Sequence, residues 1–431
     1  MLVTMNEGVR MRKADRTRKR ILDAAAEVFL DRGYGGAGLR DIATAAQMQA
    51  GSLYYHFSSR DELVIEVLRA GQDLISGAVT ERLAGLPYGA NDLDRLRVVM
   101  RAHVESLAAQ GNYTAAAMRL LGTVPPEIHH QQLSAARGYG DLWRDLIAAA
   151  QSSGVARRNL DPGAMRMLMI GALNSIPDWY RLDRQTLTGD RLADEFTTVF
   201  LDGLATVHRP RRHADVPHLE EPGRTSKSPG RGATTRSRIL ASGADAFREK
   251  GLDDTAFVDV AEAAGLQRGS LYYHFTSRDE LAEQLLRDAW TRTASVVRRA
   301  VDRLPNDASP IGRLETAITA HLLSQLSESG YTAGLVHVLA RVPQDVRRQS
   351  LRRERSYLSY LRGLVFDAVA AGELRAGIHA RTTVLILISA MNWSIEWFEP
   401  SGSLSPEQLA DQMLTLVLDG LGTAQAGRGE A

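Results

Sequence analysis

The stretch GSLYYHFSSRDEL at residues 51–63 recurs as GSLYYHFTSRDEL at residues 269–281. The two segments differ only where Ser58 stands against Thr276. Such agreement within one chain indicates a duplication, and the flanking sequence defines its extent.

The duplication covers nearly the whole chain of 431 residues. When the two copies are aligned on the repeated stretch, Ile21 corresponds to Ile239 and Trp179 to Trp397 without a gap. Beyond one deletion in a loop, LADEFTTVFLDGL corresponds to LADQMLTLVLDGL near the end of the chain. The segment between the copies is rich in Pro, His, Arg and Ser and shows no periodicity, which predicts a linker.

Charge is balanced overall but unevenly distributed. The chain has 52 Lys or Arg against 51 Asp or Glu, so its net charge indicates no class of partner. Two basic segments, residues 10–20 and 223–238, lie just upstream of the two copies of the repeated stretch. Because basic segments attract phosphates, we expect both to support binding of nucleic acid.

The composition points to a cytoplasmic protein. Cysteine is absent, which excludes disulfides and thiolate metal sites and favours a reducing compartment. The N-terminus lacks the apolar core of a signal peptide, and the longest apolar run, residues 382–391, is too short to span a bilayer. We expect no membrane partner.

The apolar spacing predicts helices throughout each copy. Residues 17–33 show helical periodicity with Gly33 as a stop, and two short helices should follow. Ser59 and Glu62 then match a capping box that starts a long fourth helix, as do Ser277 and Glu280. We expect an all-α fold with two tandem copies of a helix-turn-helix head and a helical body. The expected boundaries are head 1 at 1–62, body 1 at 63–208, linker at 209–232, head 2 at 233–280 and body 2 at 281–425.

Helical spacing sorts the residues of the repeated stretch onto two faces. Leu53 and Phe57 share an apolar face suited to packing on the preceding helices. Ser52, Tyr55 and His56 fall on another face, at i, i+3 and i+4. That face is polar, aromatic and able to form hydrogen bonds.

The two heads resemble the N-terminal domain of the tetracycline-repressor (TetR) family of bacterial transcription regulators. The resemblance rests on residues 21–63, which include ILDAAAEVFLDRGY and LRDIATAAQMQAGSLYYHFSSRDEL, and on residues 239–281. It implies a double-stranded DNA operator as partner and basic phosphate-binding positions at Arg60 and Arg278. The residues implied to face DNA are Tyr54, Tyr55 and His56, with Tyr272, Tyr273 and His274 in the second head. Ser52, on the polar face, and the equivalent Ser270 are further candidates for DNA contact.

Other residues near the start of the recognition helix suggest base readout. Gln49 and Gln267 are our candidates, because Gln can pair bidentately with adenine. Family members often carry Lys or Arg just before the recognition-helix Gly, where this chain has Ala50 and Arg268. We therefore expect the first head to hold DNA less tightly. The alternative is that the tyrosines are partly core residues and that His56 only caps the helix.

The resemblance also implies how the bodies act. Family members dimerise through the last two body helices, here residues 161–180 with 191–207 and residues 380–398 with 405–421. Since both copies lie in one chain, we expect an intramolecular pseudo-dimer; a dimer of chains with four heads is the alternative. In the family, a ligand in the body moves the fourth helix and changes the head spacing.

An effector pocket is expected in the bodies. Residues 390–411 resemble, loosely, the last helices of regulators of fatty-acid and steroid catabolism, which makes an acyl-CoA or another hydrophobic molecule the candidate effector. Plain core or interface packing is the alternative for the aromatic and amide residues involved. The candidate ligand-binding residues are Asn174, Trp179, Tyr180, Asn392, Trp393 and Trp397.

Weaker motifs point to no further chemistry. GYGGAG at residues 33–38 matches a dinucleotide fingerprint but follows a helix, and the second copy lacks it. His129 and His130 are adjacent and therefore point in different directions, so we expect no metal. We expect no cofactor and no enzymatic activity. The predicted function is a ligand-responsive repressor; a constitutive DNA-binding or architectural protein is the alternative.

Overall fold

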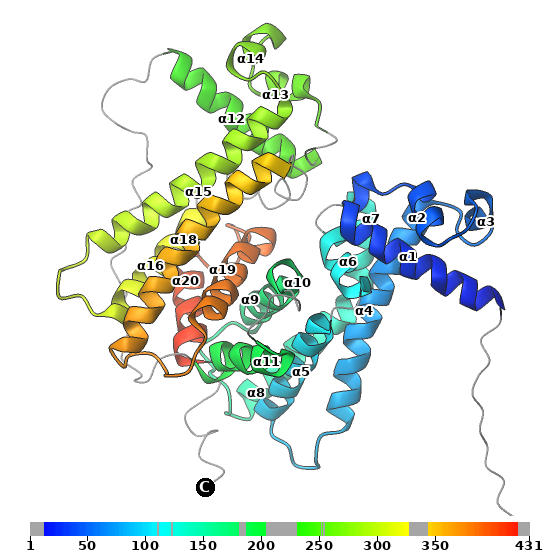
Figure 1. The fold of residues 1–431 in the computed structure, drawn as a ribbon. Coiled ribbons are helices and arrows are strands. Elements are labelled where there is room, and N and C mark those ends of the chain that lie inside the picture. Colours follow the sequence, from blue (N-terminus) through cyan, green and yellow to red (C-terminus); the bar gives the residue numbers. More distant parts are fainter. Residues whose placement is uncertain are drawn as a thin grey trace, which may run out of the picture.

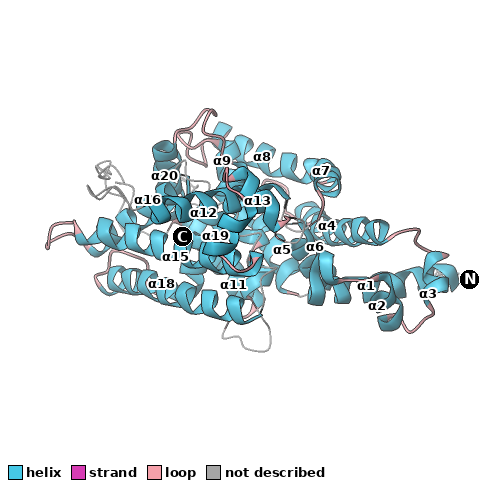
Figure 2. Cartoon of the chain, turned by 90° about the horizontal axis from the view of Figure 1, so that it is seen from above, coloured by secondary structure: helices cyan, strands magenta, loops and turns pink. Residues whose placement is uncertain are grey.

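The computed structural model describes residues 13–109, 112–121, 124–180, 187–203, 231–250, 252, 255–326 and 344–420. Every regular element among these residues is a helix, as Figure 2 shows, and the expected all-α fold is confirmed. None of the described helices is long and apolar enough to cross a membrane. Most of the predicted linker, up to residue 230, lies outside the described residues.

The two copies contain corresponding helices, although two pairs of consecutive helices in the first copy are single helices in the second (Figure 1). The first copy contains α1 (Lys13–Gly36), α2 (Leu39–Ala45), α3 (Ala50–Tyr54), α4 (Arg60–Ala84), α5 (Asp92–Ala108), α6 (Asn112–Leu121), α7 (Pro126–Ala135), α8 (Arg137–Ser152), α9 (Pro162–Asn174), α10 (Ile176–Trp179), α11 (Gly189–Thr197) and the π-helical turn η2 (Thr198–Asp202). The second contains α12 (Arg231–Lys250), α13 (Phe257–Ala263), α14 (Arg268–His274), α15 (Arg278–Asp302), α16 (Pro310–Leu326), α18 (Gln344–Ala370), α19 (Ala380–Trp397), α20 (Pro406–Leu414) and η3 (Thr415–Asp419).

The basic segments are part of helices where they are described. Helix α1 begins at Lys13, four residues before the predicted start, so residues 13–20 lie inside it. Gly33 has a φ of 69° and interrupts the helix, which confirms it as a stop. In the second copy, residues 231–238 likewise open α12, and the rest of that basic segment lies outside the described residues.

The long helices begin with a cap that differs from the predicted capping box in one bond. The Ser59 side chain accepts a hydrogen bond from the Glu62 amide at 3.1 Å. The Glu62 carboxylate reaches back to the amide and hydroxyl of Ser58, at 2.7 and 2.8 Å, instead of the Ser59 amide. These bonds lower the Glu62 pKa. Ser58 and Thr276, the one position at which the repeated stretch differs, therefore both supply a hydroxyl to this cap. The second copy repeats the cap with Ser277, Glu280 and Thr276.

Three apolar cores organise the described chain. Each head has its own core, containing Leu53 and Phe57 in the first and Leu271 and Phe275 in the second. The third core fills both bodies and runs continuously from one copy to the other. Figure 1 shows the heads at the ends of α4 and α15, away from this shared core.

The first head is also tied to its body by α6, which packs against both α1 and α4. A Cβ at Gly71 would lie 2.8 Å from both the Tyr113 carbonyl oxygen and the Ala117 Cβ, so only glycine permits this approach. The Tyr113 hydroxyl also lies 2.8 Å from an Asp23 carboxylate oxygen on α1.

The bodies join where α9 of the first copy packs on α19 of the second, in the middle of the molecule (Figure 1). A Cβ built on Gly171 would lie only 2.2 Å from Cγ of Trp393, so the indole ring rests directly on the α9 backbone. The predicted N-terminal caps are confirmed for α9 and α20. Asp161 caps α9 ahead of Pro162, and Ser405 caps α20 ahead of Pro406.

The last turns of the two copies also meet. Gly203 and Gly420 have φ values of 77° and 73°, and a Cβ on either would lie within 2.5 Å of the other copy's backbone. Arg157 donates hydrogen bonds to the carbonyls of Gly420 and Asp419, at 2.9 and 3.2 Å. Arg375, the equivalent arginine of the second copy, donates to the carbonyls of Gly203 and Asp202, at 2.7 and 3.1 Å. The two copies therefore contact each other by equivalent residues.

The turn before the recognition helix differs between the heads. Gln47 has a φ of 55°, and the equivalent Gly265 has a φ of 63°. This left-handed conformation is free of strain only for glycine, because a side chain there crowds the carbonyl oxygen. The first head therefore contains a strained residue where the second has none.

The contact of Gly171 with Trp393 can be tested by adding one methyl group. Gly171→Ala should lower the free energy of unfolding by about 1–3 kcal/mol, because the overpacked Cβ must displace the indole. Gly77→Ala is the matched control, since it lies in α4 with nothing within 4 Å of its Cβ. It should stabilise the protein by roughly 0.5–1 kcal/mol. Thermal unfolding measures both, and equal effects of the two changes would contradict the packing described.

The strain at Gln47 can be tested in the same way. Gln47→Gly should stabilise the first head by roughly 0.5–1 kcal/mol, the strain relieved minus the added chain entropy. Gly265→Gln should destabilise the second head by a similar amount, because its Cβ would also lie 3.2 Å from the Arg238 guanidinium. Calorimetry of both variants checks this, and the same sign of effect in both would refute it.

Candidate DNA interface and effector cavity

The recognition helices α3 and α14 bury one face and expose the other. Leu53 and Phe57 are buried in the head core, as expected. Tyr55 is 87% exposed, and Ser52 is exposed beside it. Gln49 is exposed, and its backbone caps α3 in an extended conformation without a capping bond from its side chain. The equivalent Gln267 has the same exposure and the same extended backbone.

The tyrosines lie outside the head cores. Tyr54 is 56% exposed, and Tyr272 is 44% exposed because the Phe257 ring meets it edge-on at 5.2 Å. Tyr273, like Tyr55, is almost fully exposed. His56 and His274 are half-buried, and Ser270 is exposed. The predicted DNA-facing residues thus lie together on an accessible face of each head, and their contact with DNA stays a prediction.

The predicted phosphate-binding arginines are partly used within the heads. The Arg60 guanidinium lies 4.1 Å from the centre of the Tyr34 ring and donates to the Tyr34 carbonyl at 3.4 Å. Arg278 donates to the Thr255 carbonyl at 3.4 Å. Both are half-buried at the start of their long helices. These contacts fix the guanidinium groups in place, and a phosphate contact stays a prediction.

Two further arginines position the recognition helices, and the sequence reasoning missed them. The Arg18 guanidinium lies 4.3 Å from the centre of the Phe57 ring, pairs with Glu66 at 3.0 Å and donates to the His56 carbonyl. Arg236 lies 4.4 Å from the Phe275 ring, in the equivalent place. The available signal was that both copies carry an arginine at this aligned position.

The heads differ just before the recognition-helix glycine. Arg268 is exposed, and its guanidinium lies 5.6 Å from the centre of the Tyr272 ring, one helical turn away. Ala50 is half-buried against the core of the first head. The second head therefore presents an additional cation and hydrogen-bond donor on its exposed face.

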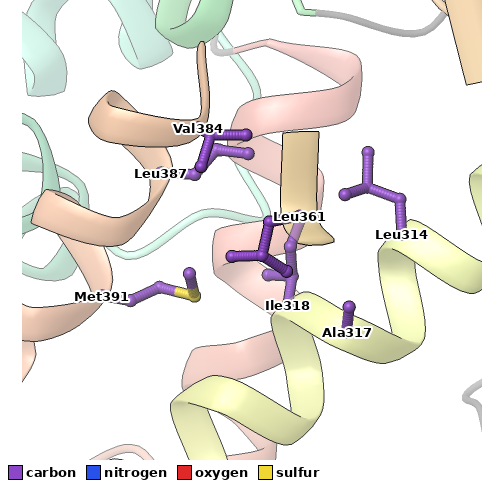
Figure 3. Close-up of a pocket in the computed structure, with 7 residues that line it drawn as sticks. All are labelled: Leu314, Ala317, Ile318, Leu361, Val384, Leu387 and Met391. Carbon is purple, nitrogen blue, oxygen red and sulfur yellow. The ribbon is translucent and has the colours of Figure 1, made fainter. Parts of the chain in front are cut away.

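An apolar cavity lies in the second body (Figure 3). Side chains of α19 face those of α16 across it, with Leu361 of α18 between them. Apart from open solvent it encloses about 10 Å³, enough for roughly one water molecule. Typical ligand pockets hold ~300–1,000 Å³, so in this conformation the cavity is far smaller than a ligand pocket. Its walls are Leu314, Ala317, Ile318, Leu361, Val384, Leu387 and Met391.

A buried polar cluster also lies in the second body. His321 Nδ1 lies 2.7 Å from the Tyr357 hydroxyl, and its Nε2 lies 3.3 Å from the Asn392 amide oxygen. Burial lowers the His321 pKa to about 4, so the ring is neutral at pH 7. His103 in the first body has the same lowered pKa, and its Nδ1 lies 2.7 Å from the Tyr139 hydroxyl.

The six predicted ligand-binding residues have different surroundings in the structure. None of them is a wall of the cavity in Figure 3. Asn392 belongs to the polar cluster, and Trp393 packs on Gly171 of the other copy. Trp179 donates to the Ser175 hydroxyl, and the Tyr180 hydroxyl donates to the Leu187 carbonyl. A ligand-binding role stays a prediction for Asn174, Trp179, Tyr180, Asn392, Trp393 and Trp397.

The weaker motifs acquire no further role among the described residues. No group of three or more potential metal-binding side chains occurs there. Residues 33–36 of the GYGGAG segment form the end of α1. The segment therefore adjoins a helix and not a strand, as expected.

Sequence profiles of known families match both copies. The profile of the bacterial regulatory proteins of the tetR family matches residues 21–67 and 239–285. The profile of the tetracyclin repressor-like C-terminal domain matches residues 89–204 and 307–421, more than half of the chain.

Several characterised proteins are similar to one copy. HTH-type transcriptional repressor KstR2 of Rhodococcus jostii (strain RHA1) is 29% identical over 195 residues, which are 43% of this chain and 90% of that protein. KstR2 of Mycolicibacterium smegmatis is 27% identical over 47% of this chain and 97% of its own length. The crystal structure of PfmR from Thermus thermophilus has 25% identity, covers 43% of this chain and all of that one, and has a TM-score of 0.40. The chain belongs to the TetR family of DNA-binding bacterial transcription regulators, and it contains the family's two domains twice.

Proposed function

We propose that this chain is a ligand-responsive transcriptional repressor that binds one near-palindromic operator as an intramolecular pseudo-dimer. A small hydrophobic or acyl-CoA-like effector in the body releases it from DNA. The regulator acts in the cytoplasm, and the proposal requires neither a cofactor nor catalysis. The working domains are head 1 (1–62), body 1 (63–208), linker (209–232), head 2 (233–280) and body 2 (281–425).

The observation that carries the proposal is that one chain presents two recognition helices on bodies that share a single core. Each helix exposes a pair of tyrosines with a half-buried histidine, and helix-turn-helix regulators read two half-sites with two such helices. The relatives named above are repressors, which supports repression as the outcome of binding.

The joint between the copies favours pairing of a first copy with a second copy, and one chain contains both. Trp393 packs on Gly171, but the residues at the equivalent positions, Ser175 and Ser389, are both serine. The large Trp393 and the small Gly171 therefore complement each other only when a first copy meets a second copy. Two second copies would place an indole against Ser389 on both sides, and two first copies would leave Gly171 facing Ser175. The first arrangement is overpacked and the second leaves a void.

The match of both bodies to the tetracyclin repressor-like C-terminal domain supports regulation by a ligand over a constitutive architectural role. The second body encloses an apolar gap of about 10 Å³, so an effector must move the surrounding side chains to enter it. The resemblance of residues 390–411 to regulators of fatty-acid and steroid catabolism makes an acyl-CoA a reasonable effector.

One chain should bind one operator with both heads. We expect a native mass near 47.2 kDa for the free protein and a single chain on each operator, because the shared body core already satisfies both copies. Native mass spectrometry measures both quantities. A free or DNA-bound protein of twice this mass would favour the dimer with four heads.

Operator binding also tests the DNA-facing residues. Tyr54→Ala with Tyr272→Ala should abolish operator binding while leaving helicity unchanged, because both side chains lie largely outside the cores. Tyr88→Ala is the matched control, a fully exposed tyrosine remote from both recognition helices, and should bind normally. If the double variant loses its helical circular dichroism, the tyrosines are core residues and the assignment fails.

The half-sites should differ in strength. A bidentate contact from Arg to guanine is worth roughly 1–3 kcal/mol, so Arg268→Ala should weaken operator binding about tenfold or more. Ala50→Arg should strengthen it, because the new side chain adds a cation beside the first recognition helix. Binding is measured on the natural operator and on two symmetrised operators built from its halves. Equal affinity for both symmetrised sites, with no effect of Arg268→Ala, would show that the heads have not specialised.

A further inference from the structure

The joint between the bodies contains two equivalent hydrogen bonds that differ in charge. In one, the backbone amide of His379 at the start of α19 donates to Oε1 of Glu195 on α11 at 3.0 Å. In the other, the amide of Asp161 at the start of α9 donates to Oε1 of Gln412 on α20 at 2.9 Å. In the alignment of the copies, Asp161 corresponds to His379. Glu195 likewise corresponds to Gln412. The same bond is therefore made once with a carboxylate and once with a neutral amide.

The residues that cap the two helices differ in the opposite sense. Asp161 caps α9 with its carboxylate, which accepts a hydrogen bond from the Ala164 amide at 2.7 Å. His379 caps α19 with its imidazole, whose Nδ1 lies 2.7 Å from the Thr382 hydroxyl and 3.4 Å from the Thr382 amide. Burial and the nearby Arg381 lower the His379 pKa, so this ring is mainly neutral at pH 7. Neither helix has an acidic residue in its first turn.

These four residues supply one carboxylate to each helix start. At α9 the carboxylate belongs to the helix itself, Asp161, and the residue that crosses from the other copy is the neutral Gln412. At α19 the helix's own cap is the neutral His379, and the carboxylate of Glu195 comes from the other copy. One carboxylate at a helix N-terminus is stabilised by the backbone amides and the helix dipole. Two carboxylates at the same N-terminus also repel each other.

Pairing of two like copies would upset this distribution. Two first bodies joined in the same way would bring Glu195 to the start of α9, where Asp161 already supplies a carboxylate. The two-fold symmetry of such a pair would repeat the repulsion at the second contact. Glu195 is only 4% exposed in the joint, so water and salt would screen this repulsion poorly. Two second bodies would place Gln412 against His379 and leave both helix starts without a carboxylate.

The hydrogen bond alone does not require the charge of Glu195, because Gln412 makes the equivalent bond without one. Burial, with a smaller contribution from Asp194, raises the Glu195 pKa, while the His379 amide and Arg191 oppose this shift. A raised carboxyl pKa means that the ionised form destabilises the fold, an effect that is absent at low pH and appears as the pH rises above that pKa. The carboxylate therefore needs a second reason, and the exclusion of a wrong partner supplies it.

We infer that the two helix caps and the residues that cross to them select the partner of each body: a first body accepts a second body and rejects another first body. The surface concerned lies on α9 and α11 of the first copy and on α19 and α20 of the second, which pack on each other. This inference rests on the proposed pseudo-dimer and deepens it, because it gives the reason why separate chains do not associate through their first bodies. It complements the packing of Trp393 on Gly171, since that indole overpacks a pair of second bodies.

Substitutions in the full chain can recreate the charges of the rejected pairing without changing the shape of the joint. Gln412→Glu is isosteric and places a second carboxylate at the start of α9, so it should lower the midpoint of thermal unfolding by about 5 °C at pH 7. In the Asp161→Asn background the same change should shift the midpoint by no more than about 1 °C. The loss should also shrink as the pH falls towards about 4, where carboxylates take up protons. All five tryptophans lie in the bodies, so their fluorescence follows the unfolding of the shared core.

The start of α19 provides the reciprocal test. His379→Asp places a second carboxylate beside Glu195 and should lower the midpoint, whereas the uncharged cap of His379→Asn should leave it nearly unchanged. Glu195→Gln combined with His379→Asp reproduces the charges at the start of α9 and should recover the midpoint. The inference is overturned if Gln412→Glu has equal effects with and without Asp161→Asn, or if His379→Asp and His379→Asn have equal effects. Operator binding and the native mass of the wild type test the proposed function separately.

Discussion

The contact of α9 with α19 is the constraint on which the rest of the structure depends. Gly171 lets the Trp393 ring reach the α9 backbone, and Gly203 and Gly420 let the last turns of the two copies touch. These close approaches merge the two bodies into one apolar core, whereas each head keeps a core of its own. The relative placement of the heads is therefore set by the joint between the bodies and by the long helices α4 and α15.

A joint within one chain allows the two copies to diverge. In a two-fold dimer of identical chains every contact occurs twice, because residue i of one chain meets residue j of the other and the reverse. Here both copies belong to one chain, which keeps them at high effective concentration, so a residue needs to fit only its actual neighbour. Trp393 with Gly171 and Ser175 with Ser389 illustrate this freedom at the joint. The same freedom permits differences at functional positions, such as Arg268 against Ala50.

The heads could be predicted from the sequence because their determinants are local. Leu53 and Phe57 follow helical spacing, and Ser59 with Glu62 marks a helix start, although the carboxylate bonds to Ser58. The walls of the cavity could not be predicted, since they come from three helices and their size matters only in combination. The packing of Trp393 on Gly171 could not be predicted for the same reason, because Gly171 lies far earlier in the chain, in the other copy.

The separate cores explain how a small movement in a body could change DNA binding under the proposed function. Helices α4 and α15 have 25 residues each, so each spans ~37 Å from body to head. At that length, a tilt of about 5° at the body end moves the head by roughly 3 Å, a displacement that hydrogen bonds to bases do not tolerate. Under the proposed function, both heads match half-sites ~34 Å apart, or a multiple of this distance, so displacing one head is enough to break the fit. A movement of either long helix would therefore be enough to weaken operator binding.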